Sequence, residues 1–456
     1  MVRSIATLMK KLNTPATISA TLGLFSMTLG LCMSGQGGAV SAADAEVARL
    51  DRAVLLRQAD RCETILSANL MPFYLPGCLD TENGGFKESL REGRFVLTGE
   101  KFLTFQARQL WLFSTLAREG YQTEACLAAA RSGFDFLQQH MLDRVHGGYF
   151  SKVTDNGGER DPRKHAYLNS FALYGLAAYY RVTHDPVALT AAKDLFRVLE
   201  AHAYDRENGG YQEFFYRDWR PINEAQESGY VGGIGHKTYN THLHLLEAFA
   251  ELYRIWPDDL VGRRLNELLL LNTSSVRHRT FDANVDAWHR DWRVVDEPRN
   301  LRASYGHDVE CAWLVLDAGR TLGLGQGMFR NWATSLCDSS IRFGYDREHG
   351  GFYGSGPLGQ PADDTRKTWW VEAEALISML EMVELTGDRT YYEVFSKTLD
   401  FVETHQVARE GSWWGTVAAD GSREGDPTRA SPWHAGYHSG RAMLECVRRL
   451  RSLASD

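Results

Sequence analysis

The chain has 456 residues, enough for two or three domains or for one large repetitive domain. Its charged fraction of 24% and apolar fraction of 44% are those of an ordinary soluble globular protein. A formal net charge of −8, without any basic run, argues against nucleic acid or an anionic membrane as a partner.

The first 42 residues have the pattern of a secretory signal peptide. Three basic residues lie within the first eleven positions, an apolar run covers about 18–33, and a small-residue stretch ends at Ala42. We predict cleavage there, which leaves 43–456 as a single domain, periplasmic or secreted. It removes three basic and no acidic residues, taking the charge from −8 to −11.

Two alternatives remain for this segment: an uncleaved membrane anchor, or a misassigned start codon that would leave the protein cytoplasmic. The apolar run is short and interrupted by Thr, Ser and Gly, so it would span a bilayer poorly. No later segment is apolar enough to cross a membrane, and we expect no membrane contact after cleavage.

Six cysteines follow the signal segment, and export would permit disulfides among them. They are scattered and form no CxxC pairs, so their spacing does not indicate zinc, and we predict no bound metal. A chain of this length can bury enough core without cross-links. We therefore expect mostly buried thiols, with Cys62 and Cys78 as the first pair to test for a disulfide.

A glycine-rich motif recurs along the chain, with about 60–65 residues between neighbouring copies. Glycine supplies the positive φ of tight turns, and the aromatic residue after each glycine pair is placed to start a short strand. The copies lie at 84–86, 147–149, 209–211 and 350–352, with a degenerate member at 411–415. One gap is doubled and the segment FDANVDAW at 281–288 fills it, which makes six units.

Pairs of helical patterns lie between these turns, with apolar residues at i, i+3, i+4 and i+7. They include 164–183 with 186–204, 307–322 with 327–343, and 368–387 with 390–406. Segments after the turns are rich in aromatics, whereas others, such as 259–271, are amphipathic. Six such hairpins predict an all-α fold, an (α/α)6 barrel with short turn and strand insertions. An open solenoid of helical hairpins is the competing interpretation.

Two histidines begin predicted inner helices, in SYGHDVE at 304–310 and in WHAGYH at 433–438. Barrel closure would bring the starts of these helices to one cavity, where His307 and His438 could face each other. Imidazole both accepts and donates protons near neutral pH. Glu310 shares a helix face with His307, whereas we interpret Asp308 as a first-turn residue that favours the helix dipole. A capping or core role for His307 is the alternative.

Two further helix starts carry polar candidates. In NTHLH at 240–244, Asn240 and His244 share a face and His242 points elsewhere. An HxH pair is not a metal signature by itself, and satisfied polar groups at a helix start are the alternative. Arg108 lies on an apolar helical face, where burial is costly without a partner. It is therefore a candidate to stabilise negative charge on an oxygen, unless it forms an outer-face salt bridge.

The segment KTWWVEAE at 367–374 starts another inner helix. Of the adjacent Trp369 and Trp370, we expect one to pack and the other to line the cavity as a platform for a sugar ring. Sugar sites combine such aromatics with carboxylates and amides, which adds the candidates Trp433, Tyr305 and Glu374. As core aromatics alone, the tryptophans would be ordinary. Signals for phosphate loops, serine nucleophile elbows and HExxH sites are absent.

Several of these motifs, in this order, resemble the N-acylglucosamine 2-epimerase superfamily. They are QARQLWLFS, NTHLHLLEAF, SYGHDVE, KTWWVEAEA and WHAGYHSGR, together with the Gly-Gly-aromatic turns, over about residues 50–450. The NTHLH and SYGHDVE forms look most like those of cellobiose 2-epimerases. The resemblance implies an (α/α)6 barrel that opens a reducing-end sugar without a cofactor, removes the C2 proton and reprotonates the opposite face of a cis-enediolate.

The resemblance also implies roles for individual residues. His307 and His438 match the two acid/base histidines, and His244 matches the residue linked to ring opening, with Asn240 beside it. The other matches are Arg108 for the enediolate oxygen, Glu310 as a site carboxylate, and Trp370 and Trp433 for sugar stacking. The chain departs from the family pattern at Val309, at Glu372, where glutamine is common, and at Ser439-Gly440, where Asn-Ser is common.

We therefore predict a sugar 2-epimerase acting on the reducing end of a β-1,4-disaccharide of the cellobiose type. An aldose–ketose isomerase acting on mannose or a related monosaccharide is the near alternative. A glycoside hydrolase would need paired carboxylates, and a catalytically dead sugar-binding protein is a third class. The expected partner is a small sugar, and the expected state is a monomer or weak homodimer.

Overall fold

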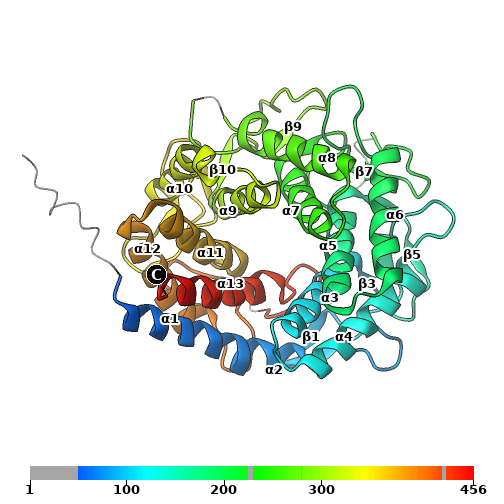
Figure 1. The fold of residues 1–456 in the computed structure, drawn as a ribbon, viewed down its shortest axis with the longest axis horizontal. Coiled ribbons are helices and arrows are strands. Elements are labelled where there is room, and N and C mark those ends of the chain that lie inside the picture. The colour runs from blue at the N-terminus through cyan, green and yellow to red at the C-terminus, as the bar shows by residue number, and fades with distance from the viewer. Residues whose placement is uncertain (1–49, 224–229, 279, 424–427, 456) are drawn as a thin grey trace, which may run out of the picture. The chain divides into compact units, whose positions relative to one another are not determined.

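Six helices line the axis of a closed ring and six others surround them in the computed structural model, which describes residues 50–223, 230–278, 280–423 and 428–455 (Figure 1). The inner helices are α3 (Leu103–Arg118), α5 (Ala166–Thr183), α7 (Tyr239–Ile255), α9 (Tyr305–Thr321), α11 (Trp369–Thr386) and α13 (Tyr437–Leu453). The outer helices are α4 (Thr123–Phe136), α6 (Pro186–His202), α8 (Asp259–Leu270), α10 (Arg330–Gly344), α12 (Arg389–Phe401) and α1 (Arg52–Thr64), which α2 (Met71–Tyr74) extends.

The ring closes because α13 packs against α3, α11 and α1, so the two ends of the described chain meet. Closure excludes the open solenoid and confirms the (α/α)6 barrel. The inner helices are buried on nearly every side, as α3 shows from Leu103 to Ala117. Outer helices such as α8 bury only one stripe, which is the amphipathic pattern expected from the sequence.

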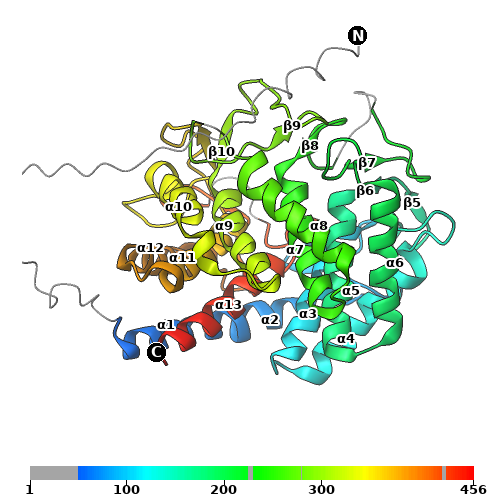
Figure 2. The same ribbon diagram turned by 45° about the horizontal axis from the view of Figure 1, so that its top comes forward.

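Short antiparallel strands gather at one end of the barrel (Figure 2). The pairs are β1 (Ser89–Arg91) with β2 (Arg94–Val96), β4 (Lys152–Val153) with β3 (Lys101–Phe102) and β5 (Glu159–Asp161), β6 (Lys164–His165) with β7 (Phe214–Phe215), β8 (Lys237–Thr238) with β9 (Ala287–Trp288), β10 (Arg302–Ser304) with β11 (Ser355–Pro357), and β12 (Lys367–Thr368) with β13 (Thr416–Val417). Five strands, β3, β6, β8, β10 and β12, lead directly into inner helices. Each of them pairs with a strand that follows the next outer helix. These pairings fix where each inner helix begins.

The recurring turns are held by buried ion pairs. In four units the aspartate that opens the turn binds the lysine two residues before the next inner helix. The Nζ–Oδ2 distances are 2.7 Å for Lys101–Asp80, 3.1 Å for Lys164–Asp143, 3.0 Å for Lys237–Asp205 and 2.8 Å for Lys367–Asp346. In the first turn Gly84 and Gly85 have φ of 81° and 66°, and a Cβ on Gly85 would lie 2.6 Å from Gln106 Oε1.

The fourth residue of five inner helices accepts a hydrogen bond from the backbone N–H of the turn. These acceptors are Gln106, Asn169, His242, Asp308 and Glu372. Asp308 lies in the first turn of α9, as predicted, and it is buried there, where it accepts a hydrogen bond from the Asn284 N–H at 3.2 Å. The shared role also explains why His242 points away from the cavity, as expected.

All six cysteines in the described part of the chain are free and buried. Cys78 accepts a hydrogen bond from Gln109 Nε2 at 3.4 Å, and burial raises the pKa of its thiol to about 12. The suggested Cys62–Cys78 disulfide is therefore wrong, because the barrel core buries both residues as separate thiols.

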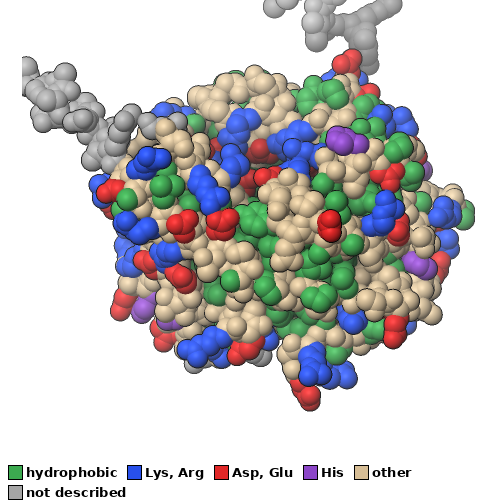
Figure 3. Space-filling view, turned by 60° about the horizontal axis from the view of Figure 1, so that its bottom comes forward, with side chains coloured by type: hydrophobic (Ala, Val, Ile, Leu, Met, Phe, Trp, Pro, Cys, Tyr) green, Lys and Arg blue, Asp and Glu red, His purple; other side chains and the backbone are tan. Residues whose placement is uncertain are grey.

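The barrel end opposite the strands holds a charged cavity of about 330 Å³. Arginines and carboxylates gather around this hollow in the upper part of Figure 3. Among them, Arg181 of α5 binds Glu251 of α7 at 2.7 Å, and Arg254 of α7 binds Asp317 of α9 at 2.5 Å. Such pairs join neighbouring inner helices at this end.

The described residues belong to one compact unit, Val47–Asp456. The predicted signal peptide, 1–42, lies outside the described residues. Within those residues, none of the helices combines the length and hydropathy that a membrane crossing requires.

Candidate active site

A cavity of about 370 Å³ opens at the strand-bearing end, where the inner helices begin. Nine of the eleven predicted site residues line it. The described residues that line it are Arg108, Tyr167, Tyr230, Val231, Asn240, His244, His307, Glu310, Trp369, Trp370, Trp433 and His438. Residues from all of the inner helices, or from the segments that lead into them, thus converge on one site, as barrel closure requires.

Trp370 contacts both His307 and His438 on the wall of the cavity. The Trp370 ring centre is 4.6 Å from the imidazole centre of His307 and 5.9 Å from that of His438. Ser304 Oγ bonds Nδ1 of His307 at 2.8 Å, and Glu374 Oε1 accepts from Nδ1 of His438 at 2.6 Å. Each bond fixes Nδ1, so in both residues Nε2 is the nitrogen left for a substrate.

Burial keeps both imidazoles neutral. It lowers the pKa of His307 to about 3, and together with the nearby Arg108 it lowers the pKa of His438 well below its ordinary value. A neutral imidazole has a free nitrogen lone pair and can remove a proton. The two predicted bases therefore line the same cavity.

His244 is the third imidazole on the cavity wall. Its Nδ1 bonds Glu247 Oε2 at 3.0 Å, which orients the ring in the same manner as the Glu374–His438 pair. The ring also packs against Tyr167 and Phe171, with centre distances of 5.2 and 4.8 Å. Asn240, one turn earlier on α7, lines the cavity, and its buried Oδ1 has no hydrogen-bond partner among the described residues.

Arg108 brings a positive charge into the cavity without a carboxylate beside it in the described structure. Its Nη1 donates to the Trp433 carbonyl and its Nη2 to the Tyr167 hydroxyl, each at 3.0 Å. The guanidinium lies 4.2 Å from the ring centre of Phe171. The predicted alternative, an outer-face salt bridge, is wrong because the side chain is buried at the cavity. An unneutralised cation there favours negative charge on a substrate oxygen.

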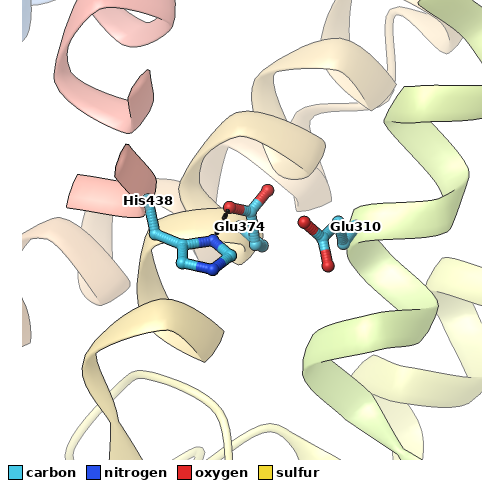
Figure 4. A group of neighbouring side chains, drawn as sticks. All are labelled: Glu310, Glu374 and His438. Carbon is cyan, nitrogen blue, oxygen red and sulfur yellow. Dashed lines mark hydrogen bonds and ion pairs between the residues drawn. The ribbon is translucent and has the colours of Figure 1, made fainter. Parts of the chain in front are cut away.

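Glu310 lies close to Glu374 and His438 (Figure 4). Oxygen and nitrogen atoms of the three residues lie within 4.8 Å of one another, a spacing that would suit a cation. However, the guanidinium of Arg441 is bound there, with Nη2 3.0 Å from Glu310 Oε1 and 2.7 Å from Glu374 Oε1. Burial and the nearby Glu374 raise the pKa of Glu310 well above its ordinary value. This shift favours the protonated form of Glu310, whose Oε2 has no hydrogen-bond partner among the described residues.

Both tryptophans of the 369–370 pair line the cavity, which corrects the expectation that one would pack away from it. They are the first two residues of α11, so they project from the mouth of the barrel, where both positions reach the opening. Trp369 stacks on His434, with ring centres 4.0 Å apart and planes at 21°. Trp433 packs edge-on against Phe102 at 4.9 Å. Three indoles thus surround the opening.

Two predicted substrate-binding residues do not line the cavity. Tyr305 precedes His307 by two positions, about 200° around the helix, and packs against Gly344 of the outer layer. Its hydroxyl lies 3.5 Å from the Gln360 carbonyl. Glu374 lies one turn deeper than Trp370, behind His438, so it orients the histidine instead of contacting substrate.

Four residues of this site were not predicted from the sequence. Tyr167 occupies the second position of its inner helix, the position that Asn240 and Trp370 have in theirs, so alignment of the repeats could have predicted it. Glu247 lies three residues after His244, a spacing that could have predicted their contact on one helix face. Tyr230 and Val231 come from a long loop between helices, for which the pattern offered no signal.

The fold and the site together define a barrel enzyme of the isomerase class. A model of the family described as N-acylglucosamine 2-epimerase matches residues 84–440, and the chain belongs to this family of carbohydrate 2-epimerases. A cellobiose 2-epimerase of Bacteroides fragilis is 30% identical over 390 residues, covering 84% of this chain and 96% of that protein.

Two further relatives extend the comparison. The solved structure of cellobiose 2-epimerase from Spirochaeta thermophila has a TM-score of 0.79 and 30% identity, covering 88% of this chain and 98% of that chain. A D-mannose isomerase of Marinomonas mediterranea is 24% identical over 420 residues, covering 85% of this chain and 98% of that protein.

Proposed function

We propose that this protein epimerises C2 of the reducing-end sugar of a β-1,4-disaccharide such as cellobiose. The observation that carries the proposal is that the imidazoles of His307 and His438 line one cavity together with Arg108, which has no carboxylate partner among the described residues. The similarity to cellobiose 2-epimerases over most of the chain supports the substrate class.

The reaction begins with ring opening, which requires a proton to leave O1 and another to reach O5. His244, oriented by Glu247, is the group proposed to move these protons. One of His307 and His438 then removes the C2 proton, and the electron pair passes to the carbonyl oxygen to give a cis-enediolate. Arg108 stabilises that oxygen anion, because a proton next to an aldehyde is far less acidic than imidazolium.

The second histidine delivers a proton to the opposite face of C2. Burial alone keeps that histidine neutral. The negative charge of the enediolate raises the pKa of the histidine and so favours the protonated form that delivers the proton. One histidine thus gains a proton and the other loses one, and both recover by exchange with water. Trp369, Trp370 and Trp433 offer flat surfaces to the sugar rings.

An aldose–ketose isomerase acting on mannose is the second candidate, because the same enediolate protonated at C1 gives a ketose. The relationship to D-mannose isomerase favours keeping it. Hydrolysis is disfavoured because, among the described residues lining the cavity, Glu310 is the one carboxyl group, whereas hydrolysis needs two flanking the bond.

Proton NMR in D2O tests both candidates with the full-length protein. We expect cellobiose to yield its C2 epimer with deuterium at C2. Fructose formed from mannose at a higher rate would instead establish the isomerase. Retention of hydrogen at C2 in every sugar tried would refute proton transfer by this site.

We also propose that the protein is exported, on the strength of the N-terminal segment 1–42. Fractionation of the producing cells, with N-terminal sequencing of the mature protein, tests it. A cytoplasmic protein that keeps residues 1–42 would contradict this proposal without affecting the catalytic one.

A further inference from the structure

Arg441 is buried, with about 2% of its surface exposed, between the histidine-holding carboxylates of the site. Its Nη1 donates to Glu247 and to Tyr437, and its Nη2 donates to Glu310 at 3.0 Å and to Glu374 at 2.7 Å. One guanidinium therefore touches three carboxyl groups that come from α7, α9 and α11.

Two of those carboxyl groups each hold a histidine of the site. Glu247 bonds Nδ1 of His244 at 3.0 Å, and Glu374 bonds Nδ1 of His438 at 2.6 Å. A carboxylate only accepts hydrogen bonds, so while it is ionised the histidine must carry its hydrogen on Nδ1 and leave Nε2 free as a base. The tautomer of each histidine thus depends on the charge of the carboxylate behind it.

We infer that Arg441 is a positioning residue that keeps Glu247 and Glu374 ionised and thereby holds His244 and His438 in their base-competent tautomers. The inference rests on the proposed function. Without the guanidinium, three carboxyl groups would face one another in a buried site, where nearby acids share protons instead of all ionising.

The electrostatics of the surrounding groups agree with this role. Although burial opposes ionisation, Arg441 holds the pKa of Glu247 below its ordinary value. Burial also opposes the charge of Arg441. The pKa of Arg441 is nevertheless held well above its ordinary value, with Glu374 as the strongest of the groups that raise it. The other titratable or charged groups near His438 in the described structure are Glu310, Arg108 and His244, and none of them can replace the bridge to Glu374.

The experiment compares Arg441→Met with Arg441→Lys and with a matched control, Arg449→Met. Arg449 is also a buried arginine of α13 and binds Glu381 and Glu384, but it lies two turns further along, at the far end of the barrel. Loss of either arginine costs stability, so thermal unfolding is measured for all variants. Only loss of Arg441 should alter the histidines.

The first readout is the pH dependence of kcat for C2 epimerisation between pH 5 and 9. Arg441→Met should move the acidic limb of the profile upward by about 1–3 pH units, because a charge this close shifts a carboxyl pKa by that amount. Arg441→Lys, which keeps a positive charge, should move it less. A lower rate with an unshifted limb would show a merely structural role and overturn the inference.

The second readout is the ¹⁵N NMR signal of His438 in the sugar-free protein, which reports its tautomer without requiring activity. We expect hydrogen on Nδ1 in the unsubstituted protein and in Arg449→Met, and a shift toward Nε2 in Arg441→Met. An unchanged tautomer would overturn the inference. If Arg441→Met does not fold, Arg441→Lys decides by the same criterion.

The two readouts separate this inference from the proposed function. If the unsubstituted protein exchanges no C2 hydrogen in any sugar, the proposed function fails. The tautomer measurement still shows whether Arg441 controls His438.

Discussion

Arg108→Met should remove most of the catalysis while leaving the fold intact. The substitution keeps a long apolar stem but deletes the one cavity-lining cation that no carboxylate neutralises in the described structure. Its donors bind two neutral oxygens, the Trp433 carbonyl and the Tyr167 hydroxyl, so no buried carboxylate loses its partner. Water in the cavity can replace these donors, and we expect a stability loss of about 1–3 kcal/mol.

The kinetic effect should be much larger than the effect on stability. Removing a preorganised donor to a developing oxygen anion costs about 100- to 1,000-fold in kcat. Initial rates of cellobiose epimerisation over a range of substrate concentrations separate kcat from KM. Arg108→Lys keeps the charge but loses the forked geometry, so it should fall between the two. If Arg108→Met changes KM alone and keeps kcat within about threefold, Arg108 binds the ground state and the oxyanion argument fails.

Three further substitutions test the fold and the corrected site. Lys101→Met leaves the buried carboxylate of Asp80 without its ion-pair partner, and should lower the free energy of unfolding by about 3–5 kcal/mol in chemical denaturation; a loss below 1 kcal/mol would mean that the turn does not depend on this pair. Tyr305→Phe should leave kcat and KM within about twofold in the same kinetic assay, because its hydroxyl faces the outer layer; a tenfold loss would return Tyr305 to the site. Burial raises the pKa of Glu372 to about 8. Between about pH 4.5 and 8, the native state therefore keeps a proton on Glu372 that the unfolded state has released. The stability contributed by Glu372 falls as pH rises through that window. Glu372→Gln keeps an acceptor for the Phe352 N–H and should therefore gain in thermal stability over the parent protein as pH rises from 5 to 8; equal pH dependence in the two proteins would contradict the shift.

Much of the fold was readable because the repeat carries its own physical signature. Glycine pairs that need positive φ mark the turns, and the 3.6-residue periodicity marks the helices between them. Six copies predict closure, because a ring leaves no apolar end exposed. Two starts of inner helices were misread: Lys164 and His165 form a strand, and so does Thr368, the residue at which another helix was predicted to begin.

The histidines of the site were predictable because they begin helices that closure must bring together. The sequence could not show that Tyr305 and Glu374 do not line the cavity. Whether they line it depends on how each inner helix is rotated about its own axis, and residue spacing alone does not give that rotation. From the sequence, Glu372 stood out only as a departure from the family pattern. Its position four residues into α11 instead matches Gln106 and Asn169, which accept the same turn hydrogen bond.

Helical register also explains how one barrel gives two arginines opposite tasks. Arg108, His244, Glu310 and Glu374 are each the sixth residue of an inner helix, and Arg441 lies at the corresponding level of α13. At this level Arg441 forms ion pairs with three carboxyl groups, whereas Arg108 packs against Phe171 and has no carboxylate partner among the described residues. The positive charge of Arg441 acts on Glu247 and Glu374, the carboxylates that bind His244 and His438, and favours their ionised forms. The positive charge of Arg108 stays available to a substrate oxygen. The carboxyl groups are thus distributed unequally around the inner helices, and this separates the side of the cavity that stabilises an oxyanion from the side that holds the bases.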